Sequence, residues 1–153
     1  MKKRLAKNNE SILIFNISLL GDSSIARELA MAENQTLYTM AEAIVDSFDF
    51  DFDHCFGFFN SIEKWFRAER AYELFKDLGE ESSPNAKGVK KTTVAEAFSF
   101  DKRLLFLFDY GDEWKFIVQC TGAGDPAHTR KYPFLIGKIG QSPEQYASSE
   151  ERP

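Results

Sequence analysis

The chain has 153 residues, 43% of them hydrophobic and 28% charged, with a formal net charge of −5. Length and composition suit one globular domain with its own core. Two cysteines, Cys55 and Cys120, are too few for a disulfide scaffold, and no apolar stretch is long enough to cross a bilayer. The acidic balance disfavours nucleic acid as a partner, because phosphate binding relies on clustered Lys and Arg. We therefore expect a cytoplasmic protein with reduced thiols.

Residues 1–10 hold the one basic cluster of the sequence, made up of Lys2, Lys3, Arg4 and Lys7. A basic cluster at a chain end is most simply a solvated, flexible tail. Asn16 and Ser18 interrupt the apolar run that follows, and no clear A-x-A cleavage site comes after it. The pattern therefore disfavours a signal peptide.

The segment 12–20 alternates between apolar and polar side chains, with Leu13, Phe15, Ile17 and Leu19 on one face. A period of two predicts a strand. The sequence GDSS at 21–24 indicates a turn, and residues 25–31 can return as a second strand.

The clearest helix of the sequence follows Thr36, which is a good N-cap residue. Apolar residues recur at the helical spacing of three and four along one stripe: Leu37, Met40, Ala41, Ile44, Val45 and Phe48. This pattern predicts an amphipathic helix with Glu42 and Asp46 in solvent.

The middle of the chain combines a short strand with less regular segments. Residues 54–60 predict a strand with Phe56 and Phe58 on one face. Residues 61–80 predict two short helical pieces, because Glu69 and Arg70 interrupt the apolar stripe. The polar residues 79–91 contain proline and two glycines and predict a mobile loop.

The last third of the chain predicts a short helix and three strands. Thr93 can cap a helix at 94–98. Residues 103–109, RLLFLFD, are apolar on both faces and predict a central strand. After a turn at 110–113, the alternation of residues 114–120 predicts a half-exposed partner strand. A loop at 121–130 leads to a last strand at 132–139, which Pro133 places at a sheet edge.

Hairpins dominate this order of elements, which indicates an α+β domain. We expect a mostly antiparallel sheet of about five or six strands, with one main helix packed on one face. A β-grasp is one arrangement that fits. The domain should span residues 11–146, since neither side of the 79–91 loop has a complete core alone, and residues 147–153 should form a polar tail.

Two segments carry a resemblance to a known family. TLYTMAEAIVDSFDFDFDHCFGF at 36–58 and LFLFDYGDEWKFIV at 105–118 resemble the plasmid pRiA4b ORF-3-like family, and the Asp-Tyr-Gly-Asp-x-Trp hairpin is the most specific part. Arg27 fits the arginine of the family's second strand. The resemblance covers residues 12–146. Many members close with Cys-Pro-Pro-Glu-Asp, where this chain has residues 141–144, Gln-Ser-Pro-Glu.

The resemblance implies an α+β fold and no particular activity. The family name records discovery on a plasmid, and some relatives lie beside mobile elements. This context suggests a function connected with mobile elements and nucleic acid, but it implies no mechanism for such a function.

The stretch FDFDFDH at 48–54 is interpreted as a helix exit that runs into a strand. Asp49 falls just after the helix, at a position where left-handed backbone geometry is common. Phe50 and Phe52 can fold back as core side chains. Asp51, Asp53 and His54 then remain as candidate functional groups.

Metal binding is disfavoured by the residues themselves. A calcium loop that started at Asp49 would need glycine at its sixth position and glutamate at its twelfth, and His54 and Asn60 stand there. His54 and Cys55 are adjacent in a predicted strand and point to opposite faces, so they cannot easily share a tetrahedral zinc site. A looser site that combines His54 with Asp109 or Asp112 stays an alternative on geometric grounds. We expect neither a metal nor a cofactor.

Catalytic chemistry would depend on His54 as a general base with Asp109 or Asp112. No nucleophile elbow, phosphate-binding glycine loop or H-E-x-x-H motif is found in the sequence. The 109–114 hairpin has a structural interpretation as well. Gly111 would supply a positive φ, an aspartate would accept hydrogen bonds from turn amides, and Trp114 would pack on the core.

Two hypotheses follow, and the lack of a catalytic motif favours the first. The chain is a small non-catalytic module that binds a partner protein or peptide, for example along a sheet edge. Alternatively, it is a metal-dependent or nucleic-acid-processing enzyme that uses His54 with nearby aspartates. The candidate binding residues are Asp51, Asp53, His54, Asp109, Tyr110, Gly111, Asp112 and Trp114. The sequence indicates no oligomeric state.

Overall fold

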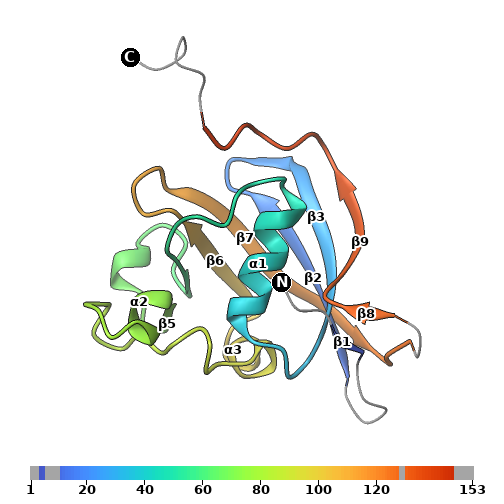
Figure 1. The fold of residues 1–153 in the computed structure, drawn as a ribbon, viewed down its shortest axis with the longest axis horizontal. Coiled ribbons are helices and arrows are strands. Elements are labelled where there is room, and N and C mark those ends of the chain that lie inside the picture. Colours follow the sequence, from blue (N-terminus) through green and yellow to red (C-terminus); the bar gives the residue numbers. More distant parts are fainter. Residues whose placement is uncertain (1–3, 6–10, 128–129, 147–153) are drawn as a thin grey trace.

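The computed structural model describes residues 4–5, 11–127 and 130–146, and one large sheet dominates it (Figure 1). Its seven strands lie in the order β5-β4-β6-β7-β2-β3-β9, and every neighbouring pair is antiparallel. A separate antiparallel pair joins β1 to β8. The bounds are β1 Arg4–Leu5, β2 Ile12–Leu19, β3 Asp22–Ala32, β4 Phe56–Phe59, β5 Ala71–Glu73, β6 Arg103–Phe108, β7 Trp114–Gly124, β8 Lys131–Tyr132 and β9 Phe134–Ile139.

In the described part of the chain, three α-helices and one 3-10 turn connect these strands: α1 Leu37–Ser47, η1 Trp65–Arg67, α2 Leu74–Asp77 and α3 Val94–Phe100. Thr36 caps α1, and its side chain accepts a hydrogen bond from the amide of Thr39. Thr93 caps α3 in a reciprocal capping box with Glu96. Both predicted N-caps are thus confirmed.

The main core lies between α1 and one face of the sheet (Figure 1). Its largest members are phenylalanines, each of which contributes roughly 1.5–3 kcal/mol when fully buried. Six of the aromatic side chains in this layer are Phe15, Phe48, Phe56, Phe58, Phe106 and Phe116. They explain why the sequence is so rich in phenylalanine.

Two smaller clusters cover the ends of the other sheet face. One gathers Phe59, Leu105 and Leu107 under Trp65 and Tyr110. The second contains Ile12, Ala30, Ala32 and Tyr132. The sheet is therefore covered on both faces at its ends, and the α1 face carries the larger core.

The α+β class and the antiparallel sheet are confirmed, but the predicted number of strands was too low. The main sheet has seven strands rather than five or six, and the described residues form three α-helices rather than one main helix. No neighbouring strands of the described sheets run parallel, so the β-grasp suggestion, which needs a parallel pair, was wrong.

Residues 61–80 contain a strand that the sequence did not predict. Tyr72 lies in β5 rather than in a helical piece, and β5 pairs with β4 through Ala71, Tyr72 and Glu73. β7 is also longer than predicted, because Thr121–Gly124, expected in a loop, extends it along β2.

The 79–91 segment has no helix or strand of its own, as predicted, but it is anchored at several points along its length. Val89 is buried in the main core, and the Asp77 carboxylate accepts hydrogen bonds from the amides of Val89 and Lys90 at 2.7 and 3.1 Å. The mobility of this loop stays a prediction. The flexible tail predicted at residues 1–10 and the polar tail predicted at 147–153 also stay predictions. Arg4–Leu5 forms β1, and the other residues of both tails lie outside the described ranges. Among the described helices, none has the length and apolar character that crossing a membrane requires.

Candidate functional site

The helix exit at residues 48–54 delivers three acidic residues to the surface. Asp49 has a φ of 60° and is exposed, as the helix-exit interpretation predicted. Phe50 is buried, and its ring centroid lies 4.9 Å from that of Trp114. Phe52 is half-buried and packs against Phe56, with ring centroids 5.4 Å apart. With the phenylalanines held in the core, the backbone presents Asp49, Asp51 and Asp53 outward.

The turn between β6 and β7 is built on Asp109. Its carboxylate Oδ1 accepts hydrogen bonds from the amides of Gly111 and Asp112 at 3.0 and 3.2 Å. Asp109 itself has a φ of 69°. The expectation that Gly111 supplies the positive φ was therefore wrong. Asp109 adopts this geometry because its short carboxylate bonds to the local backbone.

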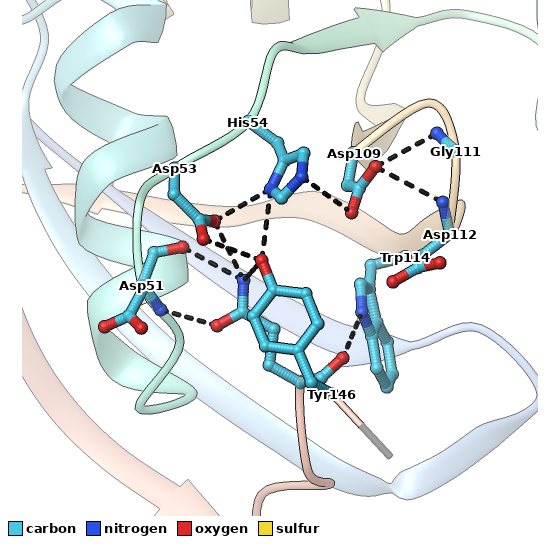
Figure 2. Close-up of polar contacts among 9 residues, drawn as sticks. Asp51, Asp53, His54, Asp109, Gly111, Asp112, Trp114 and Tyr146 are labelled. Atoms are coloured by element: carbon cyan, nitrogen blue, oxygen red, sulfur yellow. Dashed lines mark hydrogen bonds and ion pairs between the residues drawn. The ribbon is translucent and has the colours of Figure 1, made fainter. Parts of the chain in front are cut away.

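His54 lies between the helix exit and this turn (Figure 2). Its Nδ1 is 2.8 Å from Asp53 Oδ1, and its Nε2 is 3.5 Å from Asp109 Oδ2. Each ring nitrogen thus faces a carboxylate oxygen. The hydrogen bond to Asp53 raises the pKa of His54, and the charges of Asp109, Asp53 and Asp112 act in the same direction. The site favours the imidazolium form.

Asp53 also accepts a hydrogen bond from the hydroxyl group of Tyr146, a residue that was not among the predicted site residues. Tyr146 donates to Asp53 Oδ2 at 2.6 Å, and its oxygen lies 3.3 Å from His54 Nδ1. The hydrogen bond from Tyr146 lowers the pKa of Asp53, helped by His54. The same contact raises the pKa of Tyr146 to about 12.

Gln145 is the second residue that sequence reasoning missed. Its side-chain amide pairs with the main chain of Asp51, accepting from the amide at 2.7 Å and donating to the carbonyl at 3.1 Å. It also donates to Asp53 Oδ1 at 3.2 Å. The indole of Trp114 donates to the Gln145 carbonyl at 3.3 Å. We call residues 140–146 the C-terminal strap.

Arg27 holds the start of this strap from the centre of β3. It is 2% exposed. Its guanidinium donates to the carbonyls of Ser47 and Ile139 at 2.7 and 2.9 Å and to Ser142 Oγ at 2.7 Å. It also lies 4.4 Å from the ring centroid of Phe48. Burial lowers the pKa of Arg27, and Asp49 opposes that shift.

Tyr110 lies apart from the cluster around His54, although it belongs to the same β6–β7 turn as Asp109. Its hydroxyl donates to Glu73 Oε1 at 2.7 Å, and its ring packs against Phe75 and Trp65 on the opposite sheet face. Burial, followed by the hydrogen bond to Glu73, raises the pKa of Tyr110. Tyr110 is therefore not a member of the surface site that holds His54.

The predicted site residues thus divide into two groups. Asp51, Asp53, His54, Asp109 and Trp114 converge, and Gly111 and Asp112 contribute amides to the turn beneath them (Figure 2). Tyr110 lies elsewhere. Among the described residues, His, Cys, Asp and Glu side chains form no group of three or more that could hold a metal ion. What the cluster offers chemically is a charged hydrogen-bonding surface centred on His54, whose pKa is raised.

Comparison with known proteins places this chain within a family. The family model described as plasmid pRiA4b ORF-3-like protein matches residues 11–148. No curated protein matches the chain significantly. Among solved structures, the chain is similar to a protein of unknown function from Methanosarcina mazei Go1, with a TM-score of 0.71 and 20% identity over 84% of this chain and 70% of that one. At this identity the likeness shows the fold alone.

Proposed function

The chain belongs to the plasmid pRiA4b ORF-3-like family, and we propose that it is a small non-catalytic module that binds an extended peptide segment along strand β9. The partner is a protein or peptide, and a cytoplasmic location is part of the proposal. The observation that supports it best is the outer edge of β9. An edge strand presents unpaired amides and carbonyls to which another strand can add.

Strand β9 combines an open edge with apolar side chains. It stands last in the sheet order and pairs with β3 alone among the described strands. Three of its six residues are exposed apolar residues: Leu135 at 40%, Ile136 at 42% and Ile139 at 67%. An added peptide strand would bond to the main chain and bury these side chains.

The opposite edge of the sheet is less accessible. Beyond β5, the segment around Lys87 adds a further rung, since the Glu73 amide donates to the Lys87 carbonyl at 2.9 Å and the Lys87 amide donates to the Ala71 carbonyl at 3.0 Å. This edge is covered by the protein's own chain. The proposed interface is therefore at β9.

A displayed library of random eight-residue peptides, selected on the full-length protein, tests this function. Selected peptides should protect β9 amides from hydrogen exchange, and Ile136→Asp should weaken their binding at least tenfold. Phe100→Asp is the matched control, since Phe100 is 65% exposed on α3. Failure to select any peptide, or equal binding to both variants, would count against the proposal.

The second candidate function, an enzyme, is favoured by one observation. His54 lies within hydrogen-bonding distance of Asp53 and 3.5 Å from Asp109, as an oriented acid–base residue would. A metal-dependent or nucleic-acid-processing activity, in keeping with a link to mobile elements, would use this group. Incubation with single- and double-stranded DNA and RNA, with a panel of divalent ions, tests it. Cleavage should then be lost in His54→Ala. An absence of cleavage, with no ion raising the melting temperature, would end this alternative.

A further inference from the structure

The C-terminal strap is held to the site by polar contacts. Gln145 and Tyr146 form hydrogen bonds with Asp51, Asp53 and Trp114 at 2.6 to 3.3 Å (Figure 2). These bonds involve the main chain of residue 51, a carboxylate and an indole N–H. Such a set of groups recognises a ligand by its hydrogen-bonding pattern rather than by its apolar area.

The strap buries little of itself. None of its residues from Gly140 to Tyr146 is fully buried, and Tyr146 is 37% exposed. Hydrogen bonds at an exposed surface contribute about 0.5–1.5 kcal/mol each. Segments with few buried apolar contacts open locally at low free-energy cost. The end of the strap, residues 143–146, can therefore leave while Arg27 keeps its bond to Ser142 and the sheet and α1 stay folded.

Opening the strap would leave a set of oriented groups without partners. The Asp51 amide and carbonyl, the Trp114 indole N–H and the Asp53 carboxylate would all lose the bonds they make with Gln145 and Tyr146. The Gln145 side-chain amide pairs with the Asp51 main chain as the main chain of a neighbouring strand would. It accepts one hydrogen bond from the Asp51 amide and donates one to the Asp51 carbonyl. The Phe50–Trp114 ring pair, at 4.9 Å between centroids, keeps these groups in place from below.

Charge narrows the class of ligand. The surface carries the exposed carboxylates of Asp49, Asp51, Asp53 and Asp112. His54 lies between Asp53 and the buried carboxylate of Asp109. A phenol hydroxyl can donate to Asp53, whereas a phosphate in its place would meet like charge. The site therefore selects an uncharged side-chain amide next to an unmodified tyrosine.

From these contacts we infer that the surface formed by residues 51–54 and Trp114 is a peptide-recognition site for a Gln-Tyr segment of a partner protein, and that the C-terminal strap occupies it in cis. A partner that carries such a segment displaces Gln145 and Tyr146 and takes over their bonds. This site is separate from the outer edge of β9, and the inference does not depend on the function proposed there.

The test uses the full-length chain with Gln145→Ala and Tyr146→Phe combined, which removes the side-chain bonds of the strap. The probe is a fluorescein-labelled, capped peptide GQSPEQY, the sequence of residues 140–146. Because the strap competes as a tethered ligand at high effective concentration, the peptide should bind the double variant about tenfold more tightly than wild type in an anisotropy titration. Gln141→Ala, an exposed position of the same strap, should bind as wild type does.

Hydrogen exchange at the Asp51 amide reports on the site directly. This amide should exchange faster in the double variant and regain protection when the peptide is added. A peptide ending in Ala-Phe, or one with phosphotyrosine, should restore no protection. Unchanged exchange in the double variant would overturn the inference. So would faster exchange with no peptide binding, or peptide binding that leaves the Asp51 amide unprotected.

Discussion

The Arg27 guanidinium donates to Ser142 Oγ at 2.7 Å and so joins strand β3 to a residue 115 positions later in the chain. The same guanidinium bonds to the carbonyls of Ser47 and Ile139. One buried cation therefore connects the end of α1, the end of β9 and the strap.

Replacement of Arg27 by methionine should destabilise the fold by about 2–4 kcal/mol, because several buried carbonyls lose their donor. Arg27→Lys should recover little, since one ammonium group cannot reach acceptors on three segments. Urea denaturation followed by circular dichroism measures both changes. Arg67→Met, at an exposed position of η1, is the control. A loss below about 0.5 kcal/mol in Arg27→Met would contradict this account.

His54 should make the free energy of unfolding depend on pH above 6.5. Its pKa in the folded protein is raised above the ordinary 6.5, chiefly by the hydrogen bond to Asp53. The contribution is therefore fully present below pH 6.5 and is lost as pH rises through the higher folded pKa. The free energy of unfolding of wild type should fall over this range relative to that of His54→Gln. Parallel curves for the two proteins would show that the imidazolium contributes nothing.

Asp53 should make the free energy of unfolding depend on pH in the acidic range. Its pKa is lowered from 3.8, first by the Tyr146 hydroxyl, so its contribution is present above that value and is lost as pH falls through the folded pKa. Tyr146→Phe should move the Asp53 pKa upward, which carboxyl-carbon NMR titration measures. Tyr38→Phe serves as the control, because Tyr38 packs on Phe52 rather than on the carboxylate. An Asp53 pKa that does not move would show that the hydroxyl is not its main partner.

Two substitutions of Asp109 should separate the effect of its backbone geometry on stability from the effect of its charge on the pKa of His54. Asp109→Asn keeps a side chain that tolerates a φ of 69° and can accept from the Gly111 amide. It should cost little stability while lowering the pKa of His54. Asp109→Ala should cost about 1–3 kcal/mol, since it removes the acceptor and leaves an unfavourable φ. Calorimetry and imidazole NMR measure the two effects. Equal losses in the two variants would show that charge, not geometry, dominates.

Gly57 should not tolerate a side chain. A Cβ at this position would lie 2.8 Å from the Phe59 ring and 2.9 Å from the Tyr110 hydroxyl oxygen. Gly57→Ala in β4 should therefore destabilise the protein by about 1–3 kcal/mol through overpacking. Gly122→Ala, where the Cβ would meet nothing within 4 Å, is the matched control. Equal melting temperatures for the two variants would contradict the packing argument.

Much of the fold was predictable because its patterns are local. The apolar stripe from Leu37 to Phe48 and the caps at Thr36 and Thr93 correspond to the helices observed. β5 was not predictable, because its three residues become a strand only through pairing with β4. A weak helical pattern around Tyr72 was misleading for the same reason.

The site was predictable in its acidic and histidine members and not in its strap. Asp51, Asp53 and His54 stand next to a recognisable helix exit, and Asp109 stands at a hairpin turn. Gln145 and Tyr146 lie in a polar segment without periodicity, so no local signal relates them to residues over 90 positions earlier. Proximity of this kind follows from β9, which brings the chain back along β3 towards α1.

The two tryptophans of the sequence lie on opposite sides of the sheet. Trp114 packs on the core that faces α1 and bonds to the strap, while Trp65 packs with Phe59 and Tyr110 on the other face. Tryptophan emission, excited selectively so that the tyrosines do not contribute, therefore reports on the strap side in a Trp65→Phe protein and on the reverse side in Trp114→Phe. The molecule carries its own pair of optical probes, one for each layer.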